Sequence, residues 1–322
     1  MMPLCKQMQP AVHIPPCGLK LNTFNPRRQK DKVVIVMGAT GTGKSRLSID
    51  LATLFPAEII NSDKIQVYEG LDIVTNKITK EEQRGVPHHL LGILNPNADF
   101  TAPNFSDMSS LAIDTILGHD RLPIIVGGSN SFIEHLVDDY DHCSFRSKFD
   151  CCFLWVDVSM PVLHSYVSKR VDEMVRNGMV DEVRKIFDPN ADYGQGIRRA
   201  IGVPEFDNYF RNEPFVDPKT RSRLLQEAIN EIKDNNCKLA CRQLGKIHRL
   251  RNRKGWRLHR LDATEVYRKR GKEADQAWKR LVAGPSAAIV YRFLCNFTAD
   301  FPAPSSNLPS IRAPAMVAAI SH

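Results

Sequence analysis

The run Val33-Val34-Ile35-Val36-Met37 passes directly into Gly38-Ala39-Thr40-Gly41-Thr42-Gly43-Lys44-Ser45. The second part matches the pattern G-x-x-x-x-G-K-[ST], and it lies between an apolar run typical of a buried strand and a helix predicted from Gly43. Glycines let backbone N–H groups surround phosphate oxygens, the helix start adds a positive dipole end, and Lys44 adds a charge. Ser45 is the predicted Mg²⁺ ligand. The stretch therefore predicts a bound diphosphate or triphosphate, which in most such proteins is ATP.

Short apolar runs alternate with helical patterns beyond this loop. Strands are predicted at residues 33–37, 58–61, 123–126 and 152–158, with helices from Gly43, Ser129 and Pro161. This alternation predicts an α/β fold, a P-loop NTPase-like parallel sheet flanked by helices. After about residue 160 the pattern is mainly helical, and its longest helix is predicted to open at Asp217-Pro218.

The chain is therefore divided into four parts by its local composition. Residues 1–30 form a proline-rich, acid-free leader that is a candidate transit peptide, and residues 31–158 form the P-loop α/β core. Residues 159–283 form a mainly helical part that completes the active-site channel. Residues 284–322, with proline, serine and alanine throughout, are predicted to be a loosely ordered tail.

The composition is that of an ordinary soluble globular protein of 322 residues, with 43% hydrophobic and 25% charged residues. No apolar run approaches the roughly 18 residues of a membrane-spanning helix, so no membrane partner is expected. The eight cysteines form no CxxC pair, which argues against structural zinc and against a disulfide framework. A reducing compartment is the default expectation.

The formal net charge of +8 is concentrated in two segments. Residues 235–261 hold nine Lys and Arg and no acid, residues 1–30 hold five, and the remaining chain is net negative. Such a block predicts an anion site for a nucleic-acid backbone, a membrane surface or small polyphosphates, or else a solvated helix face. Four of its cations share one helical face by their spacing. They are Arg242, Lys246, Arg249 and Arg253.

Two acids, Asp157 and Asp63, are candidates for chemical roles beside the phosphate loop. A standard ATPase carries a metal-supporting Asp after a later strand, but here the strand at 122–126 ends in Gly127-Gly128. Asp157 is the alternative, unless it is only a turn residue at a strand end. Asp63 follows the strand at 58–61, and ligands of open parallel sheets bind beyond the carboxyl ends of the strands. Asp63 is therefore a candidate general base, or an N-cap of the next short helix.

Six segments follow one another along the chain in a distinctive order. They are Gly38–Ser45, Asn61–Tyr68, Thr75–Lys77, Val86–Leu91, Gly127–Ile133 and Cys241–Gln243. As an ordered set they resemble the isopentenyltransferase family, which includes tRNA dimethylallyltransferases and the adenylate isopentenyltransferases that make cytokinins. The resemblance covers roughly residues 32–280, and the ordered set is more specific than the phosphate loop alone.

The resemblance implies transfer of a dimethylallyl group from dimethylallyl diphosphate to N6 of an adenine, a first step of cytokinin biosynthesis. The phosphate loop then binds the prenyl diphosphate, so the ATPase acid is not required. Asp63 matches the family's base, because an adenine amine is a poor nucleophile that benefits from proton removal. Lys44, Ser45 with its Mg²⁺, Thr40 and Arg242 are assigned to the leaving diphosphate.

The acceptor is predicted to be free ATP or ADP, with AMP as a further candidate. The tRNA enzymes carry a helical insertion after the segment that corresponds to 127–133 and often a C-terminal zinc module, whereas here only about 20 residues lead to Cys152 and no zinc pattern follows. A tRNA partner is therefore not expected. The cations predicted for the polyphosphates, each of which also fits a solvated charge, are Lys219, Arg223, Lys272, Lys246 and Arg146.

Several alternatives stay open from the residues. They are a tRNA dimethylallyltransferase, a P-loop nucleotide kinase, and a nucleic-acid-binding module built on residues 235–261. Resemblance to the plant branch, which Asp139-Tyr140-Asp141 and residues 193–202 also carry, predicts a plastid location, with the cytoplasm as the alternative. A monomer or weak oligomer is expected. His88-His89 is assigned to packing or hydrogen bonding rather than to a metal. Cys151-Cys152 and Cys237/Cys241 are assigned to the core as small apolar side chains.

Overall fold

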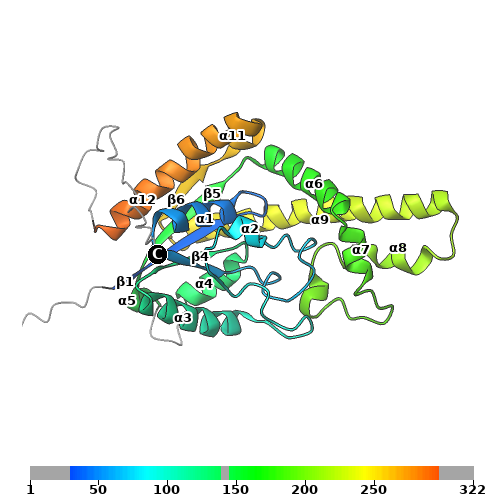
Figure 1. Cartoon of the computed structure of the whole chain (residues 1–322), viewed down its shortest axis with the longest axis horizontal. Coiled ribbons are helices and arrows are strands. Elements are labelled where there is room, and N and C mark those ends of the chain that lie inside the picture. The colour runs from blue at the N-terminus through cyan, green and yellow to red at the C-terminus, as the bar shows by residue number, and fades with distance from the viewer. Residues whose placement is uncertain (1–29, 139–144, 297–322) are drawn as a thin grey trace, which may run out of the picture.

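The computed structural model describes residues 30–138 and 145–296, and its strands form one all-parallel sheet (Figure 1). The strand order is β3-β2-β4-β1-β5-β6. The predicted α/β fold with a parallel sheet is confirmed. Residues 1–29, 139–144 and 297–322, which include Asp139-Tyr140-Asp141 and most of the predicted leader and tail, lie outside the described residues. The strands are β1 (Asp31–Gly38), β2 (Ala57–Asn61), β3 (His88–His89), β4 (Leu122–Val126), β5 (Phe149–Asp157) and β6 (Leu258–Asp262).

The central strand β1 divides the hydrophobic core into two halves. Its residues 33–37 are completely buried, as expected for a parallel strand that is covered on both faces. Because successive side chains point to opposite faces, Val33, Ile35 and Met37 join one core cluster, whereas Val34 and Val36 join the other. The apolar run that precedes the phosphate loop is therefore the strand on which both layers of helices pack.

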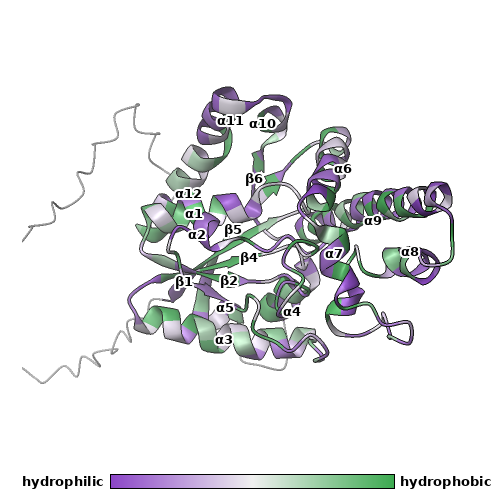
Figure 2. Cartoon of the chain, turned by 45° about the vertical axis from the view of Figure 1, so that its right-hand side comes forward, coloured by the Kyte–Doolittle hydropathy of each residue, from purple (hydrophilic) through white to green (hydrophobic). Residues whose placement is uncertain are grey.

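Two helical layers cover the sheet (Figure 1). The first contains α3 (Ala102–Gly118), α4 (Asn130–Asp138) and α5 (Phe145–Lys148), and the second contains α1 (Lys44–Leu54), α11 (Gly271–Trp278) and α12 (Gly284–Leu294). The strands are largely hydrophobic, and the helices carry hydrophobic and hydrophilic residues side by side (Figure 2). The remaining α-helices are α2 (Lys80–Gln83), α6 (Met160–Arg176), α7 (Met179–Arg184), α8 (Asp207–Asn212), α9 (Pro218–Asn252) and α10 (Thr264–Arg268).

The longest described helix, α9, begins where the sequence predicts. The Asp217 carboxylate accepts hydrogen bonds from the backbone N–H groups of Lys219 and Thr220 at 2.9 and 3.1 Å, and Pro218 occupies the first helical position. At 1.5 Å per residue, its 35 residues span about 50 Å, so the helix extends well beyond the sheet (Figure 1). None of the helices in the described ranges is long and apolar enough to cross a membrane.

Two elements near the C-terminus, strand β6 and helix α12, differ from the prediction. Strand β6 overlaps the end of the basic segment and pairs with β5. As an edge strand it buries only Leu261, so it lacks an apolar run that would reveal it. The loosely ordered tail predicted from residue 284 is wrong for its first part, because α12 occupies Gly284–Leu294. Pro285 is the second residue of that helix, which continues directly from a π-helical turn at Lys279–Ala283.

Helix α12 packs against the core and is therefore expected to contribute to the stability of the protein. Val290 is completely buried in the core cluster that contains α1, whereas Arg292 is exposed two residues later. Val290→Ala should lower the free energy of unfolding by about 1–3 kcal/mol, and Arg292→Ala by less than about 0.5 kcal/mol, in urea denaturation. Equal, negligible effects of both variants would contradict the packing of α12.

Candidate active site

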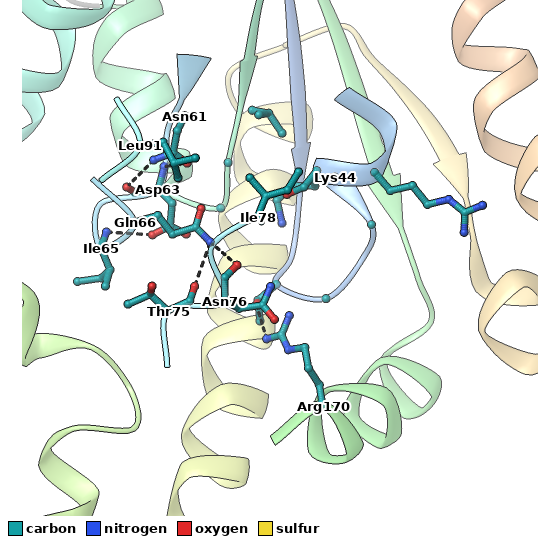
Figure 3. A pocket seen from close by; sticks show the side chains of 18 of the residues that line it. Lys44, Asn61, Asp63, Ile65, Gln66, Thr75, Asn76, Ile78, Leu91 and Arg170 are labelled. Atoms are coloured by element: carbon teal, nitrogen blue, oxygen red, sulfur yellow. Dashed lines mark hydrogen bonds between the residues drawn. The ribbon is translucent and has the colours of Figure 1, made fainter. Parts of the chain in front are cut away.

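A cavity of about 700 Å³ lies where the carboxyl ends of β1, β2 and β4 meet. The loop after β1 supplies the phosphate-loop residues, the loop after β2 supplies Asp63, and the loop after β4 supplies Gly127 and Gly128. Helices α6 and α9 close the cavity from the other side. Figure 3 shows Lys44, Asp63 and Arg170, which come from three different elements, around this one space. The predicted crevice beyond the strand ends is therefore present.

The C-terminal helices hold the phosphate loop from its outer side. Gly43 has a φ of +91°, and a Cβ at this position would lie 2.9 Å from two ring carbons of Trp278. Both the left-handed backbone and the close aromatic ring require glycine here. The Tyr267 hydroxyl donates a hydrogen bond of 2.7 Å to the Gly41 carbonyl. The loop is thus shaped by residues more than two hundred positions later in the chain.

Lys44 lies half-buried at the base of the loop. Its Nζ donates a hydrogen bond of 2.7 Å to the Ala39 carbonyl. Burial lowers the pKa of Lys44 to about 8, the Asp63 carboxylate opposes this shift, and the nearby Arg170 guanidinium adds to it. The amine therefore lacks full compensation for its positive charge. An anion bound in the loop would supply that compensation.

Arg170 of α6 is the second cation beside the loop, and sequence reasoning missed it. Its Nη2 donates a hydrogen bond of 3.0 Å to Thr40 Oγ1, whereas its buried Nε has no hydrogen-bond partner among the described residues. Burial lowers the pKa of this guanidinium. An unpaired, buried donor next to a phosphate loop indicates a place for an anion.

A signal for Arg170 was present in the helical pattern. Leu163, Val167 and Met174 are buried on one face of α6, and their spacing places Arg170 on the same face. An arginine on an otherwise apolar helix face requires an anionic or polar partner inside the protein. The partner group is the phosphate loop.

The two carboxylate oxygens of Asp63 have different surroundings. Its Oδ1 accepts a hydrogen bond of 3.0 Å from the backbone N–H of Ile65, and Asn61 Oδ1 accepts one of 3.2 Å from the backbone N–H of Asp63. A Cβ added at Gly128 would lie 3.8 Å from Asp63 Oδ2. The carboxylate therefore caps the following turn and also lines the cavity, so the two predicted roles are compatible.

A second group of cations lines the cavity beside Asp63. Burial lowers the pKa of Lys64, with further lowering by Arg199, Lys246 and Arg242, while Asp63 opposes the shift. Arg199 is anchored by hydrogen bonds to the Gly196 carbonyl and the Tyr68 hydroxyl at 3.3 and 3.2 Å. Lys64 and Arg199 were not predicted as ligand-binding residues. The predicted Arg242 lines the cavity, and Lys246 lies near it.

Lys219 and Arg223 lie away from this cavity, so their assignment to a polyphosphate is corrected. Both are exposed in the first turns of α9, and Lys219 precedes Arg242 by 23 residues, which corresponds to about 35 Å along the helix. Arg223 forms an ion pair of 2.6 Å with Glu227 on its own helix. The distance follows from the unbroken length of α9, which the sequence pattern already indicated.

Arg146 and Lys272 are also outside the cavity. Arg146 precedes β5 and so lies at the amino end of the sheet, opposite the phosphate loop. Its guanidinium stacks 5.0 Å from the centre of the Trp256 ring and donates a 3.3 Å hydrogen bond to Asp138. Lys272 is exposed in the first turn of α11. The predicted role of Arg146 near the donor is therefore corrected to a packing role.

Part of the basic segment is neutralised within the molecule. Arg249 pairs with Glu134 of α4, and Lys254 pairs with Glu134 and with Asp138 at 2.9 and 3.2 Å. Arg249 was assigned to the same face as Arg242, but its guanidinium is held by α4. The acid-free stretch of sequence therefore does not correspond to a uniformly uncompensated surface.

Asp157, the alternative metal acid, is engaged by the same segment. Its Oδ2 accepts a hydrogen bond of 2.7 Å from Arg260 Nε, and its backbone carbonyl accepts one from Ala263. Asp157 is not among the residues that line the cavity. It therefore acts as a structural acid at the end of β5.

The two histidines of β3 make hydrogen bonds, as predicted. His88 Nδ1 lies 2.8 Å from the Val86 carbonyl, and His89 Nε2 lies 2.6 Å from Glu58 Oε2. Cys152 is buried, and burial raises the pKa of its thiol to about 12. Cys241 was assigned to the core but is exposed, with its Sγ 3.5 Å from His164 Nε2.

Comparison with known proteins gives one consistent result. A family model described as IPP transferase matches residues 66–148 and 141–250. Adenylate isopentenyltransferase 3, chloroplastic, from Arabidopsis thaliana is 58% identical over 309 residues, which is 94% of this chain and 92% of that protein. Adenylate isopentenyltransferase 5, chloroplastic, from the same plant is 60% identical, with 92% and 91% covered. Adenylate isopentenyltransferase from Humulus lupulus is 47% identical, with 80% and 89% covered.

The solved structures that match share the fold at low sequence identity. A eukaryotic dimethylallyltransferase acting on tRNA aligns with a TM-score of 0.71 and 23% identity, covering 87% of this chain and 82% of that chain. The full-length tRNA isopentenylpyrophosphate transferase from Bacillus halodurans aligns with a TM-score of 0.67 and 24% identity, covering 83% and 99%.

The lowered pKa of Lys44 leads to a prediction about proton uptake. At a pH slightly above 8 the unliganded amine is mostly neutral, and a bound diphosphate should raise its pKa and so take up a proton. Calorimetric titration with inorganic diphosphate in buffers of different ionisation enthalpy measures this uptake. Lys44→Arg keeps a permanent charge and should take up correspondingly less. Equal proton uptake by both proteins would contradict a neutral Lys44.

Proposed function

Because the chain belongs to the IPP transferase family and resembles adenylate isopentenyltransferases over most of its length, we propose that it prenylates adenine nucleotides. It transfers the dimethylallyl group of dimethylallyl diphosphate to N6 of the adenine of ATP or ADP, as a first step of cytokinin biosynthesis. The names of two relatives place those proteins in the chloroplast, and we extend a plastid location to this chain. The observation that carries the proposal is a single cavity with a phosphate loop, a carboxylate and two cationic groups.

The donor diphosphate fits the phosphate-loop side of the cavity. Lys44 and Arg170 stand on this side, and the unpaired Nε of Arg170 offers a donor for a phosphate oxygen. As the allylic C–O bond breaks, negative charge grows on the diphosphate, so these cations stabilise the transition state more than the ground state. This difference lowers the barrier to ionisation.

Mg²⁺ fits the same side. The Ser45 side chain belongs to the cavity wall, and Mg²⁺ prefers oxygen ligands, retains waters and commonly uses substrate phosphates. The described residues contain no cluster of three His, Cys, Asp or Glu that could hold a metal ion. Ser45 and the diphosphate oxygens would therefore hold the ion. When bound, Mg²⁺ supplies positive charge against the leaving diphosphate.

Asp63 fits the role of general base on the acceptor side. The N6 lone pair forms a bond to C1 of the dimethylallyl group, and the C–O bond electrons leave with the diphosphate. The proton lost from N6 passes to the Asp63 carboxylate, whose Oδ2 is the oxygen not used by Ile65. A positioned base of this kind contributes about 10²–10⁴-fold to the rate.

The second cationic group gives the acceptor phosphates a binding place. Lys64, Arg199 and Arg242 line the cavity on the Asp63 side, and Lys246 lies nearby. Their mutual repulsion is relieved by a polyanion, because each additional phosphate supplies further negative charge. This arrangement supports ATP and ADP as acceptors over AMP.

The two other enzymatic candidates are less well supported. The two solved tRNA enzymes match this chain at under 25% identity, whereas the three adenylate enzymes named above match at 47–60%. A nucleotide kinase needs an acid that supports its metal after a later strand. Here β4 is followed by Gly127-Gly128, and the Asp157 carboxylate accepts a hydrogen bond from Arg260. Both facts favour prenyl transfer to a free nucleotide.

The direct test is incubation of the protein with dimethylallyl diphosphate, Mg²⁺ and one acceptor, followed by mass spectrometry. ATP and ADP should each gain one dimethylallyl group, and the γ-phosphate of ATP should stay in place. Asp63→Asn should lose about 10²–10⁴-fold in turnover while it still binds the donor. Modification of unmodified tRNA alone, or loss of the γ-phosphate, would contradict the proposed function.

Acceptor preference should depend on the second cationic group. Arg199→Ala should lower kcat/KM for ATP and ADP by about 10-fold, with a smaller effect for AMP, because it removes a charge-assisted contact to the outer phosphates. Arg198→Ala is the matched control, since Arg198 donates to Asn97 and does not line the cavity. An unchanged ratio between the three nucleotides in Arg199→Ala would remove this residue from the phosphate site.

A further inference from the structure

One side chain of α9 connects the two halves of the cavity. Gln243 Oε1 accepts a hydrogen bond of 2.7 Å from the backbone N–H of Thr40, in the phosphate loop. Its Nε2 donates a hydrogen bond of 3.0 Å to the Gly128 carbonyl, in the loop after β4. The donor and acceptor of one amide group are thus both used, each toward a different loop.

The packing around Gln243 leaves this amide little freedom. Gln243 is 8% exposed, and its own backbone carbonyl accepts a hydrogen bond of 3.2 Å from Asn130 Nδ2. A Cβ at Gly128 would lie only 2.4 Å from Gln243 Nε2, so the close approach depends on glycine at 128. A buried amide with both groups satisfied in this way has one defined orientation.

The Gly128 loop is in turn tied to Asp63. A Cβ at Gly127 would lie 2.5 Å from the Ser62 backbone, which shows how closely the two loops pack. The Lys64 backbone N–H donates a hydrogen bond of 3.0 Å to Ser129 Oγ. Ser62 and Lys64 flank Asp63 on both sides, so the position of Asp63 follows that of the Gly128 loop.

We propose that Gln243 is a positioning residue that sets the spacing between the phosphate loop and Asp63. The inference rests on the proposed function, in which the phosphate loop holds the donor and Asp63 serves the acceptor amine. Transfer requires N6, C1 and the leaving oxygen to be in line, and a misplacement of about 1 Å costs about 10²-fold in rate. Gln243 forms hydrogen bonds to both loops, whereas the hydrogen bonds of Arg170 to Thr40 and of Lys44 to Ala39 stay within the phosphate loop.

The proposal has a chemical signature besides a loss of rate. If the loops move apart, the donor still ionises at the phosphate loop, but the acceptor amine is misplaced. Water then attacks C1, the C–O bond electrons leave with the diphosphate, and loss of the water proton gives dimethylallyl alcohol. Gln243 should therefore control how the donor is divided between transfer and hydrolysis.

The test compares Gln243→Met, which keeps the length of the side chain and removes both hydrogen bonds, with Gln226→Met, an exposed position on the same helix. Prenylated ADP and dimethylallyl alcohol are measured together. Gln243→Met should lower kcat for transfer by about 10²-fold with little change in KM for the donor, and should raise the share of alcohol. Gln226→Met should match the wild type in both measurements.

Gly128→Ala approaches the same contact from the other side, because its added Cβ displaces the Gln243 amide while Gln243 itself is intact. It should also raise the share of alcohol. Equal losses of transfer and hydrolysis in Gln243→Met, with an unchanged share of alcohol in Gly128→Ala, would overturn the positioning role. Absence of nucleotide prenylation by the wild-type protein would instead overturn the proposed function on which the role rests.

Discussion

The concentration of positive charge around one phosphate loop is the constraint on which this structure depends. Lys44 and Arg170 are both half-buried there, and the Arg170 charge adds to the lowering of the Lys44 pKa. Burial of two like charges is tolerated only where a carboxylate or a bound anion offsets it. Asp63 provides part of this compensation inside the protein. The compensation is incomplete, and removal from solvent lowers the pKa of both Lys44 and Arg170 in the unliganded protein.

Helices from the C-terminal half of the chain shape the phosphate loop and the cavity beside it. Helix α6 brings Arg170 to Thr40, α9 brings Gln243 to the same residue, and Tyr267 and Trp278 pack on the loop from outside. A phosphate loop on a parallel sheet is common to many proteins and does not define a reaction. Here the additional helices make it one wall of a cavity that has the Asp63 carboxylate and a second set of cations opposite. Prenyl transfer needs both walls, since donor and acceptor must meet in line.

The sequence predicted those features that depend on neighbouring residues. The strand–loop–helix run at 33–45, the start of α9 at Asp217-Pro218 and the acid after β2 all carry local signals, and the structure shows each of them. Edge strand β6 was missed because it buries a single apolar side chain. Helix α12 was missed because the prolines, serines and alanines after residue 284 were taken as a sign of loose order. Arg170 carried a signal in its place on the apolar face of α6.

The assignment of individual cations could not come from the sequence in the same way. Local pattern alone predicted a parallel sheet with a phosphate-loop motif, because apolar periodicity and the loop motif can each be recognised over a few consecutive residues. Only the tertiary structure decided which charges converge. It placed Lys219 and Arg223 far along a straight helix, gave Arg249 to Glu134, and joined Arg199 to the Lys64 side of the cavity. Coulomb interactions depend on distance in space, and the fold brings together residues that the chain keeps more than a hundred positions apart.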